Sequence, residues 1–149
     1  LVLESDRELW QGIREGKIRT LFLLGGGAAL ELTDEQKKLL SGLEMLVVWD
    51  VAAGDLVQAA DVALPMTTFS EQEGTFVNAG GRLQRIHAAL QPPAGVKPAW
   101  STMADVAALL QQPVTAVTAA DVFNDLAARI PACAGLSYFK LADVGVQLS

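Results

Sequence analysis

Three short apolar runs, separated by helix-like segments, constrain the fold of this 149-residue chain more than any other feature. The runs are Ile18–Leu24, Met45–Trp49 and Val62–Leu64. Each run has the length and composition of a buried strand. Between them, Thr33 and Gln36 form a capping box for one helix, and Gly54–Ala60 predicts a short second helix. The short links favour a parallel βαβαβ arrangement, half of a doubly wound Rossmann-like α/β sheet.

A β-hairpin is expected after the third run. Thr75–Val77 and Arg82–Ile86 indicate two extended segments around Asn78-Ala79-Gly80-Gly81, whose residues tolerate positive φ. Pro65 is expected to end the preceding strand, because proline has no backbone N–H to donate to a neighbouring strand.

The C-terminal part predicts helices and a wrapping loop. The proline-rich residues 91–98 predict an ordered loop. Helices are expected over Trp100–Gln111, with Leu110 on its buried side, and over Ala119–Ile130, capped by Thr118. Tyr138 and Phe139 are expected to anchor the remaining residues by packing.

Length predicts a single domain over residues 1–149. We expect its βαβαβ core and hairpin over 1–90, and the wrapping loop and helices over 91–149. The chain starts with Leu1 rather than Met and contains 51% hydrophobic and 19% charged residues. These features predict a fragment of a larger subunit that buries surface against other domains.

Charge and cysteine content exclude several function classes. A net charge of −6 argues against nucleic-acid binding, which needs a basic surface. Cys133 is the only cysteine, and one thiol cannot hold an iron–sulfur cluster or a four-ligand zinc site, nor can it form an internal disulfide. We expect Cys133 to be a semi-buried apolar residue. Without an apolar run of membrane-spanning length or a signal peptide, a cytoplasmic location is expected.

The end of the first strand carries the best candidate ligand site. Gly25, Gly26 and Gly27 follow that strand at the position where open α/β sheets bind ligands, and their backbone N–H groups could hold a phosphate. Asp50 ends the second strand at the same sheet edge. The glycines alone are a weak signal, because neither a G-x-G-x-x-G pattern nor a following lysine is present.

Charged residues around the hairpin have competing interpretations. Glu71 and Glu73 could form a general acid–base pair, but the favoured hypothesis is that Glu71 pairs with Arg82 or caps N–H groups across the hairpin. His87 is the only histidine and is interpreted as a surface residue. Neither a catalytic residue nor a metal ligand is predicted.

The segment ADVALP followed by SEQEGTFVNAGGRLQR, within 60–86, resembles the pattern ADVVLP…AE-x-DGT-x-x-N-x-EGR-x-Q of the molybdopterin oxidoreductase superfamily. KIRTLFLLG and MLVVWD resemble strands of that family, and AGLSYFKLADVGVQ resembles the segment that closes the corresponding region. The residues that match the family frame are Asp61, Pro65, Glu71, Gly74, Thr75, Asn78, Gly81, Arg82 and Gln84.

The resemblance implies a pterin cofactor site that this chain keeps only in part. The family binds a molybdopterin guanine dinucleotide and carries iron–sulfur clusters N-terminal to this region. Where the family has G-x-N-P, Ala28-Ala29 stand here, and Gly54 and Leu56 replace a Thr-x-Thr turn. Gly25–Gly27 and Asp50 are therefore predicted to be a vestigial cofactor site, and we expect this chain itself to bind no cofactor.

The resemblance implies part of an oxidoreductase without a complete active site. The favoured hypothesis is a non-catalytic scaffold domain of the large iron–sulfur subunit of bacterial NADH:quinone oxidoreductase (complex I), which supports NADH-to-quinone electron transfer. Its partners would be other domains and subunits of a respiratory complex peripheral to the inner membrane, with a dimer through an exposed sheet face as a further possibility. The alternative is the cofactor-pocket domain of a molybdopterin-dependent formate dehydrogenase. A free-standing nucleotide-binding module is a third hypothesis.

Overall fold

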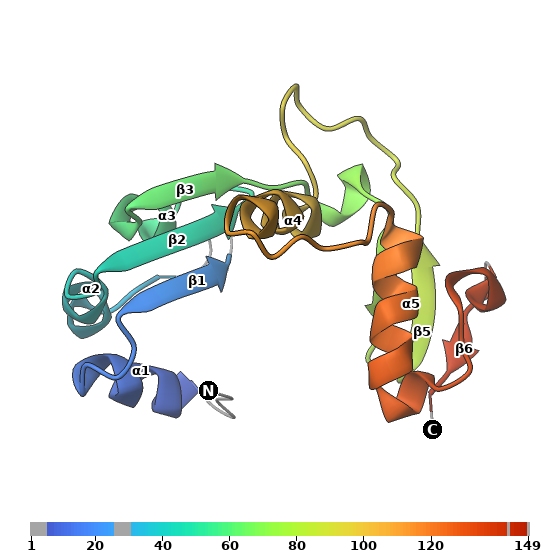
Figure 1. The fold of residues 1–149 in the computed structure, drawn as a ribbon, viewed down its shortest axis with the longest axis horizontal. Helices are drawn as coiled ribbons and strands as arrows, with labels where there is room; N and C mark the ends of the chain where they lie inside the picture. The colour runs from blue at the N-terminus through green and yellow to red at the C-terminus, as the bar shows by residue number, and fades with distance from the viewer. Residues whose placement is uncertain (1–5, 26–30, 143, 149) are drawn as a thin grey trace. The chain divides into compact units, whose positions relative to one another are not determined.

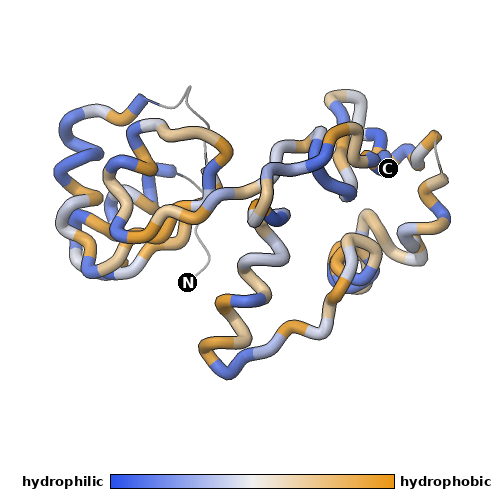
Figure 2. Tube along the Cα trace, turned by 90° about the horizontal axis from the view of Figure 1, so that it is seen from above, coloured by the Kyte–Doolittle hydropathy of each residue, from blue (hydrophilic) through white to orange (hydrophobic). Residues whose placement is uncertain are grey.

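The computed structural model describes residues 6–25, 31–142 and 144–148. They form two compact units, Leu1–Met66 and Thr67–Ser149, each described here by itself. Figure 2 shows hydrophobic residues interspersed with hydrophilic ones along both units, as expected for elements with one buried side.

The N-terminal unit contains a three-stranded parallel sheet of order β1-β2-β3 (Figure 1). Its elements are α1 (Asp6–Arg14), β1 (Thr20–Leu24), α2 (Asp34–Leu40), β2 (Met45–Asp50), α3 (Asp55–Ala59) and β3 (Val62–Pro65). Phe22 aligns with Val47 and Val62 across the sheet. The predicted parallel pairing of neighbouring strands is confirmed, and so is the mixed α/β fold class.

Helices cover one face of this sheet. Leu46 and Val48 of β2 are fully buried in a core shared with Ile13 of α1, Leu40 of α2 and Leu56 of α3. The capping box that starts α2 is confirmed, since Gln36 N donates to Thr33 Oγ1 at 3.2 Å and Thr33 N donates to Gln36 Oε1 at 2.9 Å.

The opposite face of the sheet carries exposed apolar side chains. Phe22 is 47% exposed, Leu24 58% and Val62 42%, and the ring of Phe22 stacks on Trp49 with centroids 5.9 Å apart. Because side chains alternate along a strand, Phe22 and Leu24 point away from the helices that bury Leu21 and Leu23. One sheet face is therefore incompletely covered, as a half of a doubly wound fold predicts.

The C-terminal unit contains a second, antiparallel sheet of order β4-β5-β6. Its elements are η1 (Phe69–Glu71), β4 (Gly74–Val77), β5 (Arg82–Ile86), α4 (Ala99–Leu109), α5 (Ala119–Arg129), η2 (Pro131–Cys133), η3 (Tyr138–Leu141) and β6 (Val146–Gln147). The predicted hairpin is confirmed by the antiparallel β4–β5 pairing. The short strand β6 was not predicted.

The core of the C-terminal unit joins β5 to α5 and the last helical turns. Leu83 packs with Phe123, Cys133, Tyr138 and Leu141, each at most 7% exposed. Burial of Cys133 and Tyr138 matches the sequence predictions.

Two sequence predictions about packing in this unit are wrong. Phe139 is 81% exposed, and Leu110 is 66% exposed. The 3₁₀ turn at Tyr138 can direct only one of two adjacent side chains inward, which leaves Phe139 in solvent. Leu110 falls at the C-cap of α4, beyond the last helical residue, so it does not continue the helix's inner side.

Candidate functional site

The carboxyl edge of the parallel sheet brings Gly25 and Asp50 together. Because β1 and β2 run in parallel, both residues lie at the same sheet edge, and Gly25 N donates to Trp49 O at 2.6 Å. Gly26 and Gly27 lie outside the described residues, so their part in this site stays a prediction.

The carboxylate of Asp50 is turned inward. The residue is 6% exposed, and its Oδ1 accepts hydrogen bonds from Val51 N at 2.6 Å and Ala52 N at 3.3 Å. Its Oδ2 is buried and has no partner among the described residues. A β-carbon built on Gly25 would lie closer to this carboxylate than real β-carbons approach any atom. Asp50 therefore requires glycine at position 25.

A hollow of about 290 Å³ lies beside Asp50 in the same unit. Its walls include Val51, Ala52, Val57 and Leu64, and Asp50 is the only charged residue among the described residues that line it. The described lining is therefore apolar apart from Asp50, and it includes no cation that could neutralise a phosphate.

The two positions that replace the family's Thr-x-Thr turn are structural here. Gly54 precedes the first turn of α3 and makes no side-chain cap. Leu56 is 5% exposed and belongs to the core between the helices and the sheet. Neither residue contributes a polar group to the sheet edge.

Two acidic residues of the family frame bind backbone groups nearby. Asp61 Oδ2 accepts from Leu46 N at 2.7 Å and so ties the start of β3 to β2. Glu71 Oε2 accepts from Thr68 N at 2.9 Å within its own 3₁₀ turn. The expected pairing of Glu71 with Arg82, or its cap across the hairpin, is therefore wrong. The Glu71 carboxylate instead takes part in a capping box with Thr68, three residues earlier in the chain.

The hairpin turn is organised by Asn78. Its Oδ1 accepts from Arg82 N at 3.0 Å, and its Nδ2 donates to Gln84 Oε1 at 3.3 Å. Gly81 has a φ of 77°, a conformation that suits glycine. Arg82 Nη1 donates to Val144 O at 3.3 Å. Together these contacts hold the turn and the segment before β6.

A second polar group, which sequence reasoning did not assemble, surrounds Glu73 in the C-terminal unit. Tyr138 OH donates to Glu73 Oε2 at 3.3 Å, and His87 Nδ1 lies 3.7 Å from Glu73 Oε1. The guanidinium carbon of Arg85 lies 4.3 Å from the centre of the Tyr138 ring. Glu73 and Tyr138 are 65 positions apart, and nothing in the local sequence pattern links them.

Two further structural features bear on function. Among the described residues, no group of three or more His, Cys, Asp or Glu side chains is placed to hold a metal ion. The helices in that part of the chain are all too short or too polar to cross a membrane.

Known proteins match this chain over most of its length. The family model for molybdopterin oxidoreductase matches residues 2–109. "Putative formate dehydrogenase YrhE" of Bacillus subtilis is 33% identical over 133 residues, 88% of this chain and 14% of that protein. "F420-dependent formate dehydrogenase 2 subunit alpha" of Methanococcus maripaludis is 32% identical over 113 residues, 74% of this chain and 17% of that protein.

A third relative has a different named activity. "NADPH-Fe(3+) oxidoreductase subunit alpha" of Geobacter sulfurreducens is 29% identical over 137 residues, 89% of this chain and 16% of that protein. These matches support the predicted superfamily, but they do not single out complex I. The chain spans about a sixth or less of the length of these curated relatives. The family match over residues 2–109 shows that the chain belongs to the molybdopterin oxidoreductase family.

Proposed function

We propose that this chain is a supporting, non-catalytic segment of a formate-dehydrogenase-like oxidoreductase subunit. The likeness to formate dehydrogenases over 88% and 74% of the chain supports that type of parent enzyme. The supporting role rests on one observation, the inward position of the Asp50 carboxylate at the sheet edge.

The described residues do not fit the pyrophosphate of a pterin guanine dinucleotide. Pyrophosphate needs convergent N–H donors or cations at the strand ends. Here Val51 N and Ala52 N already donate to Asp50 Oδ1, and the carboxylate places negative charge where the phosphates would lie. Each missing charge-assisted hydrogen bond weakens binding by about 1.5–3 kcal/mol. We therefore propose that this chain holds no pterin dinucleotide by itself.

The proposed role is to hold other parts of the subunit in place. The relatives named as alpha subunits come from proteins far longer than this chain, so partner domains and subunits are the surfaces that it would support. The apolar sheet face with Phe22, Leu24 and Val62 is a candidate contact surface for that purpose. A peripheral, cytoplasmic location is part of the same proposal.

A cofactor-pocket role is the second candidate, and one observation favours it. The hollow beside Asp50 lies at the carboxyl edge of the parallel sheet, where open α/β sheets bind ligands. A scaffold of the NADH:quinone oxidoreductase type would use the same residues in another parent enzyme. Cysteine clusters with a catalytic cysteine or selenocysteine upstream in the parent gene would indicate formate dehydrogenase, and clusters alone would indicate complex I.

Calorimetric titration of the full chain with GDP and GMP tests the supporting role. We expect no binding tighter than about 10 μM, because Val51 N and Ala52 N already donate to Asp50. Asp50→Asn keeps an acceptor for Val51 N but removes the charge, and Asp125→Asn, on the exposed side of α5, is the matched control. Tighter binding that Asp50→Asn abolishes and Asp125→Asn leaves intact would establish the cofactor-pocket role instead.

A further inference from the structure

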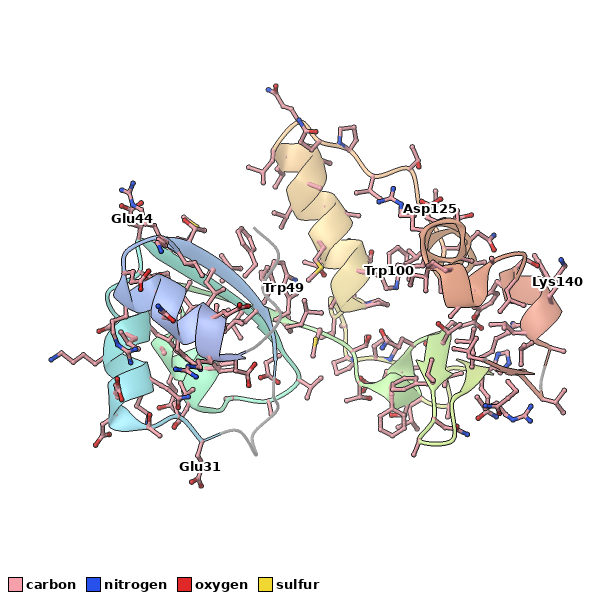
Figure 3. The ribbon with its side chains drawn as sticks, turned by 90° about the horizontal axis from the view of Figure 1, so that it is seen from below. Glu31, Glu44, Trp49, Trp100, Asp125 and Lys140 are labelled. Carbon is pink, nitrogen blue, oxygen red and sulfur yellow. The ribbon has the colours of Figure 1, made fainter. Side chains whose placement is uncertain are left out.

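The free edge of β4 borders a groove within the C-terminal unit, apart from the sheet edge described above. Helix α5 lies alongside the β4–β5 hairpin (Figure 1). A hollow of about 190 Å³ lies between β4 and α5, and its lining includes Thr75, Phe76, Val122 and Leu126. Trp100, whose side chain lies between the start of α4 and α5 (Figure 3), also lines it. The hollow is smaller than most small-molecule sites, about 300–1,000 Å³, and fits a single side chain better.

The hydrogen bonds of the hairpin leave every second residue of β4 free. Asn78 N donates to Arg82 O at 3.0 Å, so in this antiparallel register Phe76 is a residue of β4 that bonds to β5. The backbone N–H and C=O groups of Thr75 and Val77 therefore point away from β5. None of these groups has a hydrogen-bond partner among the described residues. An unpaired strand edge of this kind accepts an additional strand.

Apolar side chains of α5 lie beside this free edge. Val122 and Leu126 are one helical turn apart on the same side of α5, and Leu126 is 46% exposed. Phe123 and Ala127, on the neighbouring side of the helix, are buried against Leu83 of β5. Because β4 is the strand next to β5, the first pair of side chains lies toward the open edge of the sheet. A strand added to β4 would therefore contact an apolar wall.

Glu73 places a negative charge just before β4. Side chains two positions apart on a strand share a face, so Glu73 and Val77 lie on the face where Leu83, opposite Val77, packs against α5. The Glu73 carboxylate accepts from Tyr138 OH and lies 3.7 Å from His87 Nδ1, yet its side chain is 53% exposed. In the described part of the chain no lysine or arginine forms an ion pair with it. A basic side chain on a partner would complement this charge.

We propose that this groove binds an extended peptide as a fourth, antiparallel strand of the β4-β5-β6 sheet. The peptide backbone exchanges hydrogen bonds with Thr75 and Val77, and antiparallel pairing is the more stable arrangement. The peptide residue opposite Thr75 enters the hollow beside Val122 and Leu126 and is aliphatic. The residue two positions later lies opposite Glu73 and is lysine or arginine. Main-chain bonds thus supply affinity, and these two side chains supply specificity.

The probe is the peptide acetyl-Val-Thr-Leu-Thr-Lys-amide, titrated into the full ¹⁵N-labelled chain and followed by ¹H–¹⁵N correlation spectra and amide hydrogen exchange. The amides of Thr75 and Val77 should shift, saturate with a dissociation constant on the order of 0.1–1 mM, and exchange more slowly in the complex. Serine in place of the peptide's leucine should weaken binding about ten-fold or more. Glutamate in place of its lysine should weaken binding about two- to five-fold.

Variants of the chain test the free edge itself. Thr75→Pro removes the free N–H without removing a bond to β5, so it should abolish saturable binding. Thr75→Val keeps the N–H and the branched side chain, and as the matched control it should change the affinity by less than about two-fold. If Thr75→Pro does not fold, Leu126→Lys places a charge in the apolar wall and should weaken binding about ten-fold. Leu109→Lys, outside the groove, is the control for that variant.

Equal binding by the leucine and serine peptides, or by the proline and valine variants, would overturn the proposal. Slower exchange of the Thr75 and Val77 amides at rising protein concentration, without peptide, would also overturn it and would assign the groove to a second copy of the chain. The outcome is independent of the GDP titration, because the groove and the hollow beside Asp50 share no described residue.

Discussion

The carboxylate of Asp50 occupies the space that a side chain at position 25 would need. A β-carbon on Gly25 would approach both carboxylate oxygens of Asp50 within 3.0 Å. Because Oδ1 holds two backbone N–H groups, the carboxylate cannot turn away without losing those bonds. Gly25 and Asp50 thus form one structural pair at the edge where ligands bind in related folds.

The first prediction concerns this pair. Gly25→Ala should destabilise the chain by about 1–3 kcal/mol, because the added methyl group displaces the buried carboxylate. The matched control is Gly42→Ala, where the new β-carbon would lie 3.4 Å from its nearest neighbour, Leu39 O. Urea unfolding of both variants checks the difference. The prediction would be contradicted if Gly25→Ala lowered the free energy of unfolding no more than Gly42→Ala does.

The second prediction concerns Gly145, where the chain passes close to β5. Its φ is 71°, and an added β-carbon would clash with the carbonyl oxygen of Leu83. Gly145→Ala should destabilise by about 2–4 kcal/mol, from backbone strain and overpacking together. Gly135→Ala separates these effects, because Gly135 has a φ of 76° with nothing within 4 Å. The Gly135→Ala variant should lose about 1–2 kcal/mol of unfolding free energy, from backbone strain alone. Equal losses in unfolding experiments would show that the close approach is unimportant.

The third prediction concerns pH and the cap of α5. The Thr118 hydroxyl, followed by Val117 N and Thr118 N, donates to Asp121 and lowers the pKa of this carboxyl from its ordinary 3.8. A lowered folded-state pKa stabilises the fold at pH values above 3.8, and this contribution is lost as the pH falls through the lowered pKa. Asp121→Asn should therefore lower the unfolding midpoint at pH 7 and have progressively less effect in acid.

Thermal unfolding between neutral and acidic pH checks the third prediction. Asp125→Asn removes a charge from the same helix without removing the cap, so it should not reproduce the loss at pH 7. A difference between Asp121→Asn and the unmutated chain that stays constant across the whole pH range would refute the assignment.

The fourth prediction concerns the uncovered sheet face. The isolated chain should self-associate through this face, because contiguous exposed apolar surface is unusual on a self-sufficient monomer. Leu24→Lys should reduce the association, since Leu24 is 58% exposed beside Phe22. Leu109→Lys changes an even more exposed leucine in the other unit and is the control. Sedimentation velocity at increasing concentration measures the effect, and a monomer at every concentration would count against it.

Local sequence determined most of the secondary structure of this protein. Thr33 with Gln36 and Thr118 with Asp121 satisfy helix starts through residues three positions apart, so their patterns are visible in the sequence. The apolar runs and short links likewise determined the parallel order of β1, β2 and β3. The hairpin followed from the glycines and asparagine of its turn.

Only the tertiary structure decided how polar side chains meet. Sequence placed Asp50 at a strand end, but its inward turn toward Gly25 depends on contacts between neighbouring strands. The C-terminal unit brings Glu73, Arg85 and Tyr138 together from segments up to 65 positions apart. Local propensity carries no information about such distant contacts, because long-range packing sets them after the elements have formed. For the same reason, the burial of Tyr138 and the exposure of Phe139 followed from packing against α5 and β5, not from their shared hydrophobic character.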